Sequence, residues 1–275
     1  RLYTVSMDPF AITPFREPFA VSALGDASLG DNSRNISFFP DGTFVITFMS
    51  WDGDIDGISA RRFTEDGDPI DTIDIFVNGQ IADNQTDSSV IAVEDGSFVV
   101  VWESQFEGAP GQLGTDGDGN SIQLQIINPD GSGRFQDKYG NSEIVVNSIP
   151  EKNQRSPFLE RGQNGTVLVA WEDPTFGDPS LPGDGTGDEN VGRFINPSAE
   201  SVEELFLGEP FVINRNTTGD VDEVWIERIG DQGRFIAAYE SDVDPDGDPF
   251  MISPDTENES VIMTALDSEG KSVVD

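Results

Sequence analysis

A fourfold internal repeat constrains the fold of this chain more than any other sequence feature. Each copy has a Gly-containing turn followed by an apolar run that ends in polar residues. The copies read DGTFVITFMSWD (41–52), DGSFVVVWES (95–104), NGTVLVAWED (164–173) and QGRFIAAYES (232–241). Repeated units are stabilised mainly by packing on their neighbours, so the repeat predicts a modular architecture.

Each copy divides into short apolar runs, which we name strands a to d. Strand a leads through a tight turn into strand b, as in a hairpin. Strand a covers 35–39, 89–93, 157–161 and 224–228; strand c covers 58–63, 122–127, 191–195 and 261–266; strand d covers 75–78, 144–147 and 211–214. Strand b is apolar on both faces, which predicts a position inside a stack of sheets.

These patterns predict an all-β fold: a β-propeller-like domain of four recognisable four-stranded repeats. A β-sandwich and an elongated β-solenoid are the rival architectures. We expect a single domain over 1–275, with repeats at about 27–80, 81–147, 148–214 and 215–275. Residues 1–26 are expected to form a partial blade or closing strands. The start at Arg1, without an initiator Met or signal peptide, suggests a processed piece.

The charge balance and the missing residue types exclude several functions. The chain has 52 Asp and Glu against 15 Lys and Arg, a formal net charge of −37. Nucleic acid and anionic membrane surfaces would be repelled, and no apolar run is long enough for direct membrane insertion. There is no Cys or His, which excludes thiol chemistry, the usual zinc sites and imidazole-dependent triads. Any metal must be a hard cation held by oxygen.

The loop between strands b and c is acidic and Gly-rich in every copy. The candidate metal ligands are Asp52, Asp54 and Asp56 in the first loop, Asp116, Asp118 and Asn120 in the second, Asp184, Asp188 and Asn190 in the third, and Asp242, Asp244, Asp246 and Asp248 in the fourth. Alternating oxygen ligands can curl around calcium where Gly permits the curvature, so calcium is the predicted cofactor. The competing interpretation is that Asp and Gly serve only as turn residues.

Aromatic and acidic residues at the end of strand b are a second candidate feature. Trp51, Trp102 and Trp171 are assigned to one repeat position and expected in the blade core, whereas Trp225 is expected to be more exposed. Glu103, Glu172 and Glu240 follow aromatic residues at strand ends. Two carboxyl groups suffice for glycoside hydrolysis. Repetition of these glutamates in successive copies favours a structural role over catalysis.

The repeats resemble those of very large secreted bacterial proteins, the RTX-type adhesins and cell-surface proteins with calcium-dependent repeats. The matching stretches are ADNQTDSSVIAVEDGSFVVVWES (82–104), IQLQIINPDG (122–131) and IVVN (144–147). The resemblance implies an extracellular or cell-surface location, calcium-supported folding and a role in adhesion. The nonapeptide calcium repeat of RTX roll domains is absent from the sequence.

Two functions follow as expectations. The first is a non-enzymatic, extracellular, calcium-binding propeller module with an adhesive or surface-assembly role, whose partners are other surface proteins or glycans. The alternative is a carbohydrate-binding or polysaccharide-cleaving protein.

Overall fold

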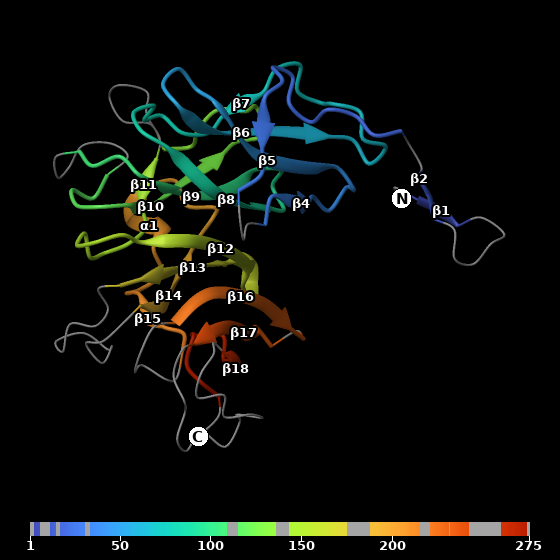
Figure 1. Cartoon of the computed structure of the whole chain (residues 1–275). Coiled ribbons are helices and arrows are strands. Elements are labelled where there is room, and N and C mark those ends of the chain that lie inside the picture. The colour runs from blue at the N-terminus through green and yellow to red at the C-terminus, as the bar shows by residue number, and fades with distance from the viewer. Residues whose placement is uncertain are drawn as a thin grey trace.

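The computed structural model describes most of the chain in enough detail to follow its sheets (Figure 1). The described residues are 3–5, 12–14, 17–30, 34–108, 115–135, 143–174, 188–214, 221–230, 232–241 and 260–273. Among them, none of the helical segments is long and apolar enough to cross a bilayer.

Four antiparallel sheets, which we call blades 1 to 4, follow one another along the chain (Figure 1). Blade 1 contains β3 (Ala27–Ser28), β4 (Ile36–Phe38), β5 (Phe44–Trp51), β6 (Asp56–Phe63) and β7 (Ile75–Phe76). Blade 2 contains β8 (Gln85–Ala92), β9 (Phe98–Ser104), β10 (Ser121–Ile127) and β11 (Ile144–Val145). Blade 3 contains β12 (Arg155–Arg161), β13 (Val167–Asp173), β14 (Glu189–Ile195) and β15 (Phe211–Val212). Blade 4 contains β16 (Val221–Ile229), β17 (Arg234–Ser241) and β18 (Ser260–Leu266).

The remaining described elements are small. A separate hairpin pairs β1 (Tyr3–Val5) with β2 (Ile12–Pro14), and a 3-10 turn, η1 (Gln163–Gly165), connects β12 and β13. The short helix α1 (Val202–Leu205) lies within the segment that leads to β15. The sheets confirm the predicted all-β, propeller-like fold. Within blades 2 to 4, each strand pairs with the strand that follows it in the chain. The predicted division into one domain with four repeats stays a prediction.

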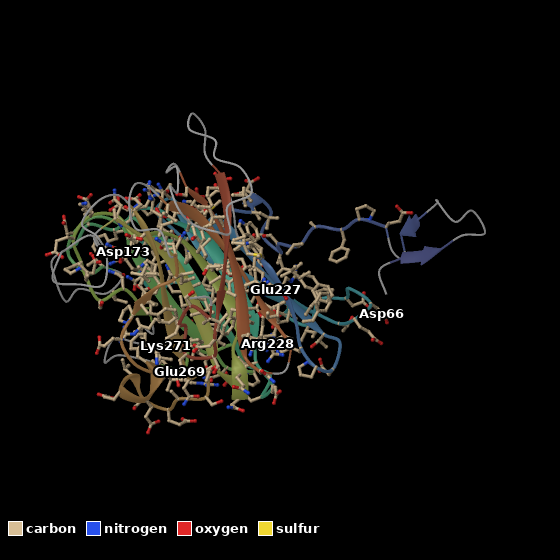
Figure 2. The ribbon with its side chains drawn as sticks, turned by 90° about the horizontal axis from the view of Figure 1, so that it is seen from below. Asp66, Asp173, Glu227, Arg228, Glu269 and Lys271 are labelled. Atoms are coloured by element: carbon tan, nitrogen blue, oxygen red, sulfur yellow. The ribbon has the colours of Figure 1, made fainter. Side chains whose placement is uncertain are left out.

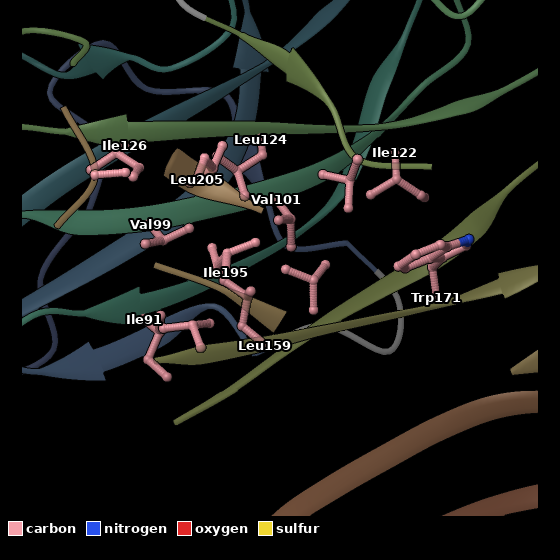
Figure 3. Packing of buried hydrophobic residues seen from close by; sticks show 14 of the residues in the cluster. Ile91, Val99, Val101, Ile122, Leu124, Ile126, Leu159, Trp171, Ile195 and Leu205 are labelled. Carbon is pink, nitrogen blue, oxygen red and sulfur yellow. The ribbon is translucent and has the colours of Figure 1, made fainter. Parts of the chain in front are cut away.

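The blades stack face to face in chain order, and this explains why strand b is apolar on both faces. In β9, Val100 and Trp102 pack towards blade 1, whereas Val99 and Val101 pack towards blade 3. Blades 2 and 3 share the largest buried cluster, which includes Ile91, Leu159 and Trp171 (Figure 3). Successive side chains point to opposite faces of a strand, so a central strand needs apolar residues at every position.

The structure corrects one assignment within these strands. Trp102 and Trp171 are fully buried, as expected, but Trp51 is 66% exposed. The pairing of strands b and c shows the reason. Phe48 lies opposite Ser59 in blade 1, and Trp102 lies at the matching position opposite Gln123 in blade 2, each within the apolar part of its strand. Phe48 is therefore the buried counterpart of the two tryptophans, and Trp51 extends past the end of the core.

An asparagine after strand d joins each of blades 1 and 2 to the next blade. Asn78 accepts a hydrogen bond from the backbone N–H of Ile58 (2.7 Å) and donates to Gln85 Oε1 at the start of β8 (3.1 Å). Asn147 repeats both contacts, with Ile122 N (3.0 Å) and with Gln154 Oε1 before β12 (3.0 Å). Each asparagine side chain thus hydrogen-bonds both to a backbone N–H in strand c of its own blade and to a glutamine side chain at the start of the following blade.

In blade 3 the asparagine at the same position is Asn214, preceded by Ile213 where blades 1 and 2 have Val. Asn214 accepts a hydrogen bond from the N–H of Asn190 (2.9 Å) and donates to Glu189. All three asparagines are buried. Buried amides in such networks are costly to leave unpaired. We call the contacts of Asn78 and Asn147, which reach the following blade, the asparagine clip.

The segment before β3 lies on blade 1. The Phe19 ring lies 5.6 Å from the ring of Phe63, and the backbone N–H of Ala23 donates to the carboxylate of Asp74 (2.9 Å). An apolar cavity of about 560 Å³ lies between residues 20–29 and the face of blade 1 that includes Ile46 and Phe48. Residues 18–22, whose sequence resembles strand d, therefore contact the first blade rather than the last.

Replacing one clip residue should destabilise the fold strongly. Asn147→Ala removes both clip contacts and leaves the Ile122 N–H and Gln154 Oε1 without these partners, so we expect the free energy of unfolding to fall by roughly 2–4 kcal/mol. Urea denaturation followed by tryptophan fluorescence measures this. The adjacent exposed Ser148 provides the control, since Ser148→Ala should change the value by less than about 0.5 kcal/mol. Equal effects of the two substitutions would contradict the role of the clip.

Candidate functional site

Polar side chains gather at the edge of the blades where strand a begins and strand b ends. Antiparallel pairing brings these two strand ends together in each blade: Thr86 lies opposite Glu103 in blade 2, and Arg155 lies opposite Glu172 in blade 3. The innermost strands β8, β12 and β16 also pack on one another. Residues from three blades therefore meet at one end of the propeller, and we call this group the carboxylate cluster.

The first strand of blades 2, 3 and 4 has a β-bulge at this edge. The residues with left-handed backbone conformation are Asp87 (φ 51°), Ser156 (φ 52°) and Glu223 (φ 48°), and the strand register shifts at each of these positions. A bulge redirects a side chain, and a non-Gly residue in this conformation costs about 1–3 kcal/mol. Recurrence of the bulge in three blades means that the surrounding structure maintains it.

Arg155 connects the carboxylates of blade 3. Its Nη2 donates to Asp188 Oδ2 at 2.6 Å, and its Nε lies 3.6 Å from Glu172 Oε2. Glu172 is buried and accepts a further hydrogen bond from the backbone N–H of Glu223 in blade 4 (2.9 Å). The Glu172 carboxylate is thus paired on one side with a guanidinium and on the other with the bulged strand of the next blade.

Glu103 is the most perturbed member of the cluster. It is 6% exposed, and its Oε1 accepts a hydrogen bond from Asn120 Nδ2 at 2.7 Å. Burial and, to a smaller extent, the negative charge of Asp87 raise the pKa of Glu103 to about 7, against the opposing effects of Gln105, Asn120 and Arg155. A carboxyl group with a pKa near neutrality can both donate and accept a proton under physiological conditions.

Asp87 lies beside Glu103 and is itself closely packed. A Cβ atom added at Gly30 would lie 2.6 Å from Asp87 Oδ1 and 2.8 Å from its Cα, so only glycine fits at this approach. Asp87 is half-buried, whereas Glu103 is nearly covered. The two carboxyl groups therefore differ in environment, which is the usual way in which a protein assigns different protonation states to two acids.

The acidic loops predicted to bind metal have another structural role in blades 1 and 2. Asp52 Oδ2 accepts a hydrogen bond from the clip residue Asn78 (2.8 Å), and Asp116 Oδ2 accepts one from Asn147. The next predicted ligand in each loop accepts a backbone N–H from the connection between strands d and a. These pairs are Asp54 with Asp83 N and Asp118 with Lys152 N, both at 3.2 Å.

The other predicted ligands are dispersed. Asp56 is exposed in β6, Asn120 donates to Glu103, and Asp188 pairs with Arg155. Asn190 is buried, and its N–H donates to Asn214. Asp184, Asp242, Asp244, Asp246 and Asp248 lie outside the described residues.

The interpretation as an adhesive calcium module is wrong. In the described part of the chain, no group of three or more acidic side chains is arranged to hold a metal ion. The described loop carboxylates of blades 1 and 2 accept hydrogen bonds from amides and the backbone instead, which gives their recurrence a structural reason. Calcium as a cofactor stays a prediction.

Sequence reasoning found some members of the carboxylate cluster and missed others. Glu103 and Glu172 were recognised, but as carboxylates that a propeller could expose, and both are buried. Asp87, Arg155 and Glu223 were not recognised. Their signal is a polar residue near the start of each first strand, and its meaning depends on the bulge, which the sequence pattern does not reveal.

Comparisons with known proteins support the fold without showing a family. No protein-family model matches the chain, and no curated protein sequence matches it either. The solved structures that match include polysaccharide lyase Uly1, with a TM-score of 0.50 and 7% identity over 82% of this chain and 52% of the lyase. This chain thus spans about half the length of the lyase.

Two further matches have lower TM-scores. An endo-arabinase from Bacteroides thetaiotaomicron has a TM-score of 0.43 and 9% identity, covering 91% of this chain and 85% of the enzyme. A thermostable family-43 glycoside hydrolase has a TM-score of 0.45 and 13% identity, covering 87% of this chain and 73% of the enzyme. The expected resemblance to RTX-type adhesins is wrong, because no family model matches the chain and the structure that matches with a TM-score of 0.50 is that of a polysaccharide lyase.

The raised pKa of Glu103 predicts a pH-dependent stability. The folded state binds the proton more tightly than the unfolded chain, so this contribution is fully present below about pH 4.5 and is lost as the pH rises through about 7. Between these pH values the Glu103 contribution lowers the unfolding free energy by on the order of 3 kcal/mol, and Glu103→Gln should remove this decrease. Chemical denaturation at several pH values measures the slope. Glu107→Gln, at an exposed neighbour, should retain the wild-type slope.

Proposed function

We propose that this chain binds a polysaccharide across the carboxylate cluster and cleaves it by glycosidic hydrolysis. The observation that carries the proposal is Glu103, a carboxyl group with a pKa of about 7 beside the carboxylate of Asp87. Hydrolysis of a glycosidic bond needs one carboxylic acid to protonate the leaving oxygen and one carboxylate on the other side of the bond. The cluster supplies both from one blade.

In this mechanism Glu103 is the general acid and Asp87 the general base. Glu103 donates its proton to the glycosidic oxygen as the bond from that oxygen to the anomeric carbon breaks. Asp87 accepts a proton from water, and the water oxygen forms the new bond to the anomeric carbon. A proton then returns from Asp87 to Glu103 through solvent, which restores the starting state with no further reactant.

The neighbouring groups support this division of roles. Asn120 donates a hydrogen bond to Oε1 of Glu103, which restricts rotation of the carboxyl group. Arg155 contacts Asp188 and Glu172 and so places a positive charge within the cluster, where it limits the repulsion among the carboxylates. These residues are positioning residues, since they act through the two carboxyl groups.

The composition and the structural comparisons are consistent with a glycan substrate. The chain has no His or Cys, so carboxyl groups are its main candidates for proton transfer near neutral pH. Its net charge of −37 favours neutral over anionic polysaccharides. The similar structures are named as a polysaccharide lyase, an endo-arabinase and a glycoside hydrolase. We include in the proposal the extracellular or cell-surface location predicted from the sequence, where such polymers occur.

Turnover should depend on both carboxyl groups. With soluble xylan, arabinan and β-glucan as substrates, we expect Glu103→Gln and Asp87→Asn each to lower the release of reducing ends by roughly 100- to 10 000-fold. Glu65→Gln, in an exposed turn, should leave turnover unchanged. Full activity of either cluster variant would contradict the assigned roles. Binding of these polymers by the wild-type protein without cleavage would reassign the chain as a carbohydrate-binding protein.

A further inference from the structure

The chain contains two Asn-Gly dipeptides, and the fold places them in opposite environments. Asn78–Gly79 follows strand d of blade 1, and Asn164–Gly165 lies in the turn between β12 and β13. An asparagine side chain before glycine can react with the glycine backbone nitrogen, because glycine has no side chain to hinder the close approach. The reactivity of each dipeptide therefore depends on how the structure holds it.

Asn164 lies at the exposed tip of its turn. Its backbone has the left-handed conformation (φ 56°, ψ 32°), and Gly165 follows with φ 80°. Both residues are exposed, and a Cβ atom added at Gly165 would have no atom outside residues 164–166 within 4 Å. In the part of the chain that the structure describes, no hydrogen bond restrains the Asn164 side chain. The side-chain amide is therefore accessible to water and to its own backbone.

The matching turns of blades 1 and 2 restrain this position, whereas the turn of blade 3 does not. The three turns read DGT (41–43), DGS (95–97) and NGT (164–166). Asp41 Oδ1 accepts hydrogen bonds from the N–H and the hydroxyl of Thr43 (3.0 and 2.6 Å), and the turn of blade 2 has the same two contacts. In blade 3 both donors of Thr166 bind the carbonyl oxygen of Gln163 instead (3.1 and 2.8 Å).

Contacts with blade 4 hold the base of the blade 3 turn rather than its tip. Arg228 of β16, labelled in Figure 2, donates to the carbonyl oxygen of Gly162 at 3.2 Å. A Cβ atom added at Gly233 would lie 2.7 Å from Gln163 Cβ, so these two residues are in close contact. The Arg228 guanidinium also places a positive charge at the turn, and such a charge favours a carboxylate formed nearby.

Asn78, in contrast, is buried and has both polar atoms of its side chain engaged. Its Oδ1 accepts the clip hydrogen bond from Ile58 N–H, and its Nδ2 has three acceptors within hydrogen-bonding distance. The nitrogen that would react is also engaged, because Gly79 N–H donates to Glu143 Oε2 at 2.9 Å. A reaction at Asn78 therefore requires local opening of the clip.

We propose that Asn164 is a site of spontaneous deamidation in the folded protein and that the asparagine clip protects Asn78 from the same reaction. The Gly165 nitrogen forms a bond to Cγ of Asn164, the Cγ–Nδ2 bond breaks, and the amide leaves as ammonia with the proton of the Gly165 N–H. Water then opens the cyclic imide. Opening at Cγ gives aspartate, and opening at the main-chain carbonyl carbon gives isoaspartate, whose backbone runs through Cγ.

The two products differ in how they fit the turn. Aspartate gives blade 3 the DGT sequence of blade 1, so its carboxylate can accept hydrogen bonds from Thr166 as Asp41 does from Thr43. Isoaspartate adds a CH₂ group to the main chain, inside the turn that the hydrogen bond from Gly162 N–H to Thr166 O closes (2.8 Å). The aspartate product therefore keeps the hairpin, whereas the isoaspartate product weakens it.

Peptide mapping by mass spectrometry tests the site. Folded wild-type protein is incubated in mildly alkaline buffer, and the mass change from amide to acid is followed at both dipeptides. We expect Asn164 to deamidate at least roughly tenfold faster than Asn78, because local opening limits the reaction at the buried site. In urea the two rates should agree within about threefold, because both dipeptides are then exposed. Isomerisation at Asp-Gly dipeptides leaves the mass unchanged and does not interfere.

Two variants test the structural reasons separately. Glu143→Ala removes the acceptor of Gly79 N–H and should raise the rate at Asn78 while leaving the rate at Asn164 unchanged. Asn164→Asp carries the aspartate product and should melt no lower than the wild-type protein. Equal rates at the two dipeptides in the folded protein, or deamidation of Asn164 only in urea, overturns the proposal. A lower melting temperature of Asn164→Asp overturns the fit of the product. Thermal melting also confirms that the Glu143→Ala variant is folded.

Discussion

The asparagine clip is the interaction on which the arrangement of the blades depends. Apolar packing holds neighbouring sheets together, but it is non-directional and does not fix where one blade ends and the next begins. Asn78 and Asn147 do so, because each contacts strand c of its own blade and a glutamine that precedes or begins the following blade. The acidic loops complete the same network through Asp52 and Asp116.

This network gives a physical reason for the repeated acidic loops. The amide nitrogen of each clip asparagine has several acceptors within reach, namely the glutamine side chain, a backbone carbonyl and the loop carboxylate. Alternating aspartates in such a loop can bind a cation, and they can also accept hydrogen bonds from an asparagine side chain. The sequence pattern is the same in both cases. The contacts of the described loops give the recurring aspartates a structural role, and calcium binding stays a prediction.

The carboxylate cluster uses the same end of the blades for a different purpose. The hydrogen bonds of the clip hold the strand ends in place. The bulges at Asp87, Ser156 and Glu223 then redirect side chains at these ends. Burial of Glu103 between blades raises its pKa, while Arg155 offsets part of the negative charge. Strained and polar groups of this kind persist where packing elsewhere stabilises the fold, which is typical of functional sites.

The sequence by itself determined the strands, their order and the all-β class, because two-sided apolar runs separated by Gly turns are satisfied by stacked sheets. It favoured a propeller over a sandwich or a solenoid. It also marked two members of the cluster, Glu103 and Glu172, whereas the contacts of Asn78 and Asn147 came from the structure. Only the tertiary structure decided that Trp51 lies outside the core and that Asp87 and Arg155 lie near Glu103. These facts depend on register, on bulges and on contacts between blades, which bring together residues far apart in the chain, and local sequence patterns do not specify such contacts.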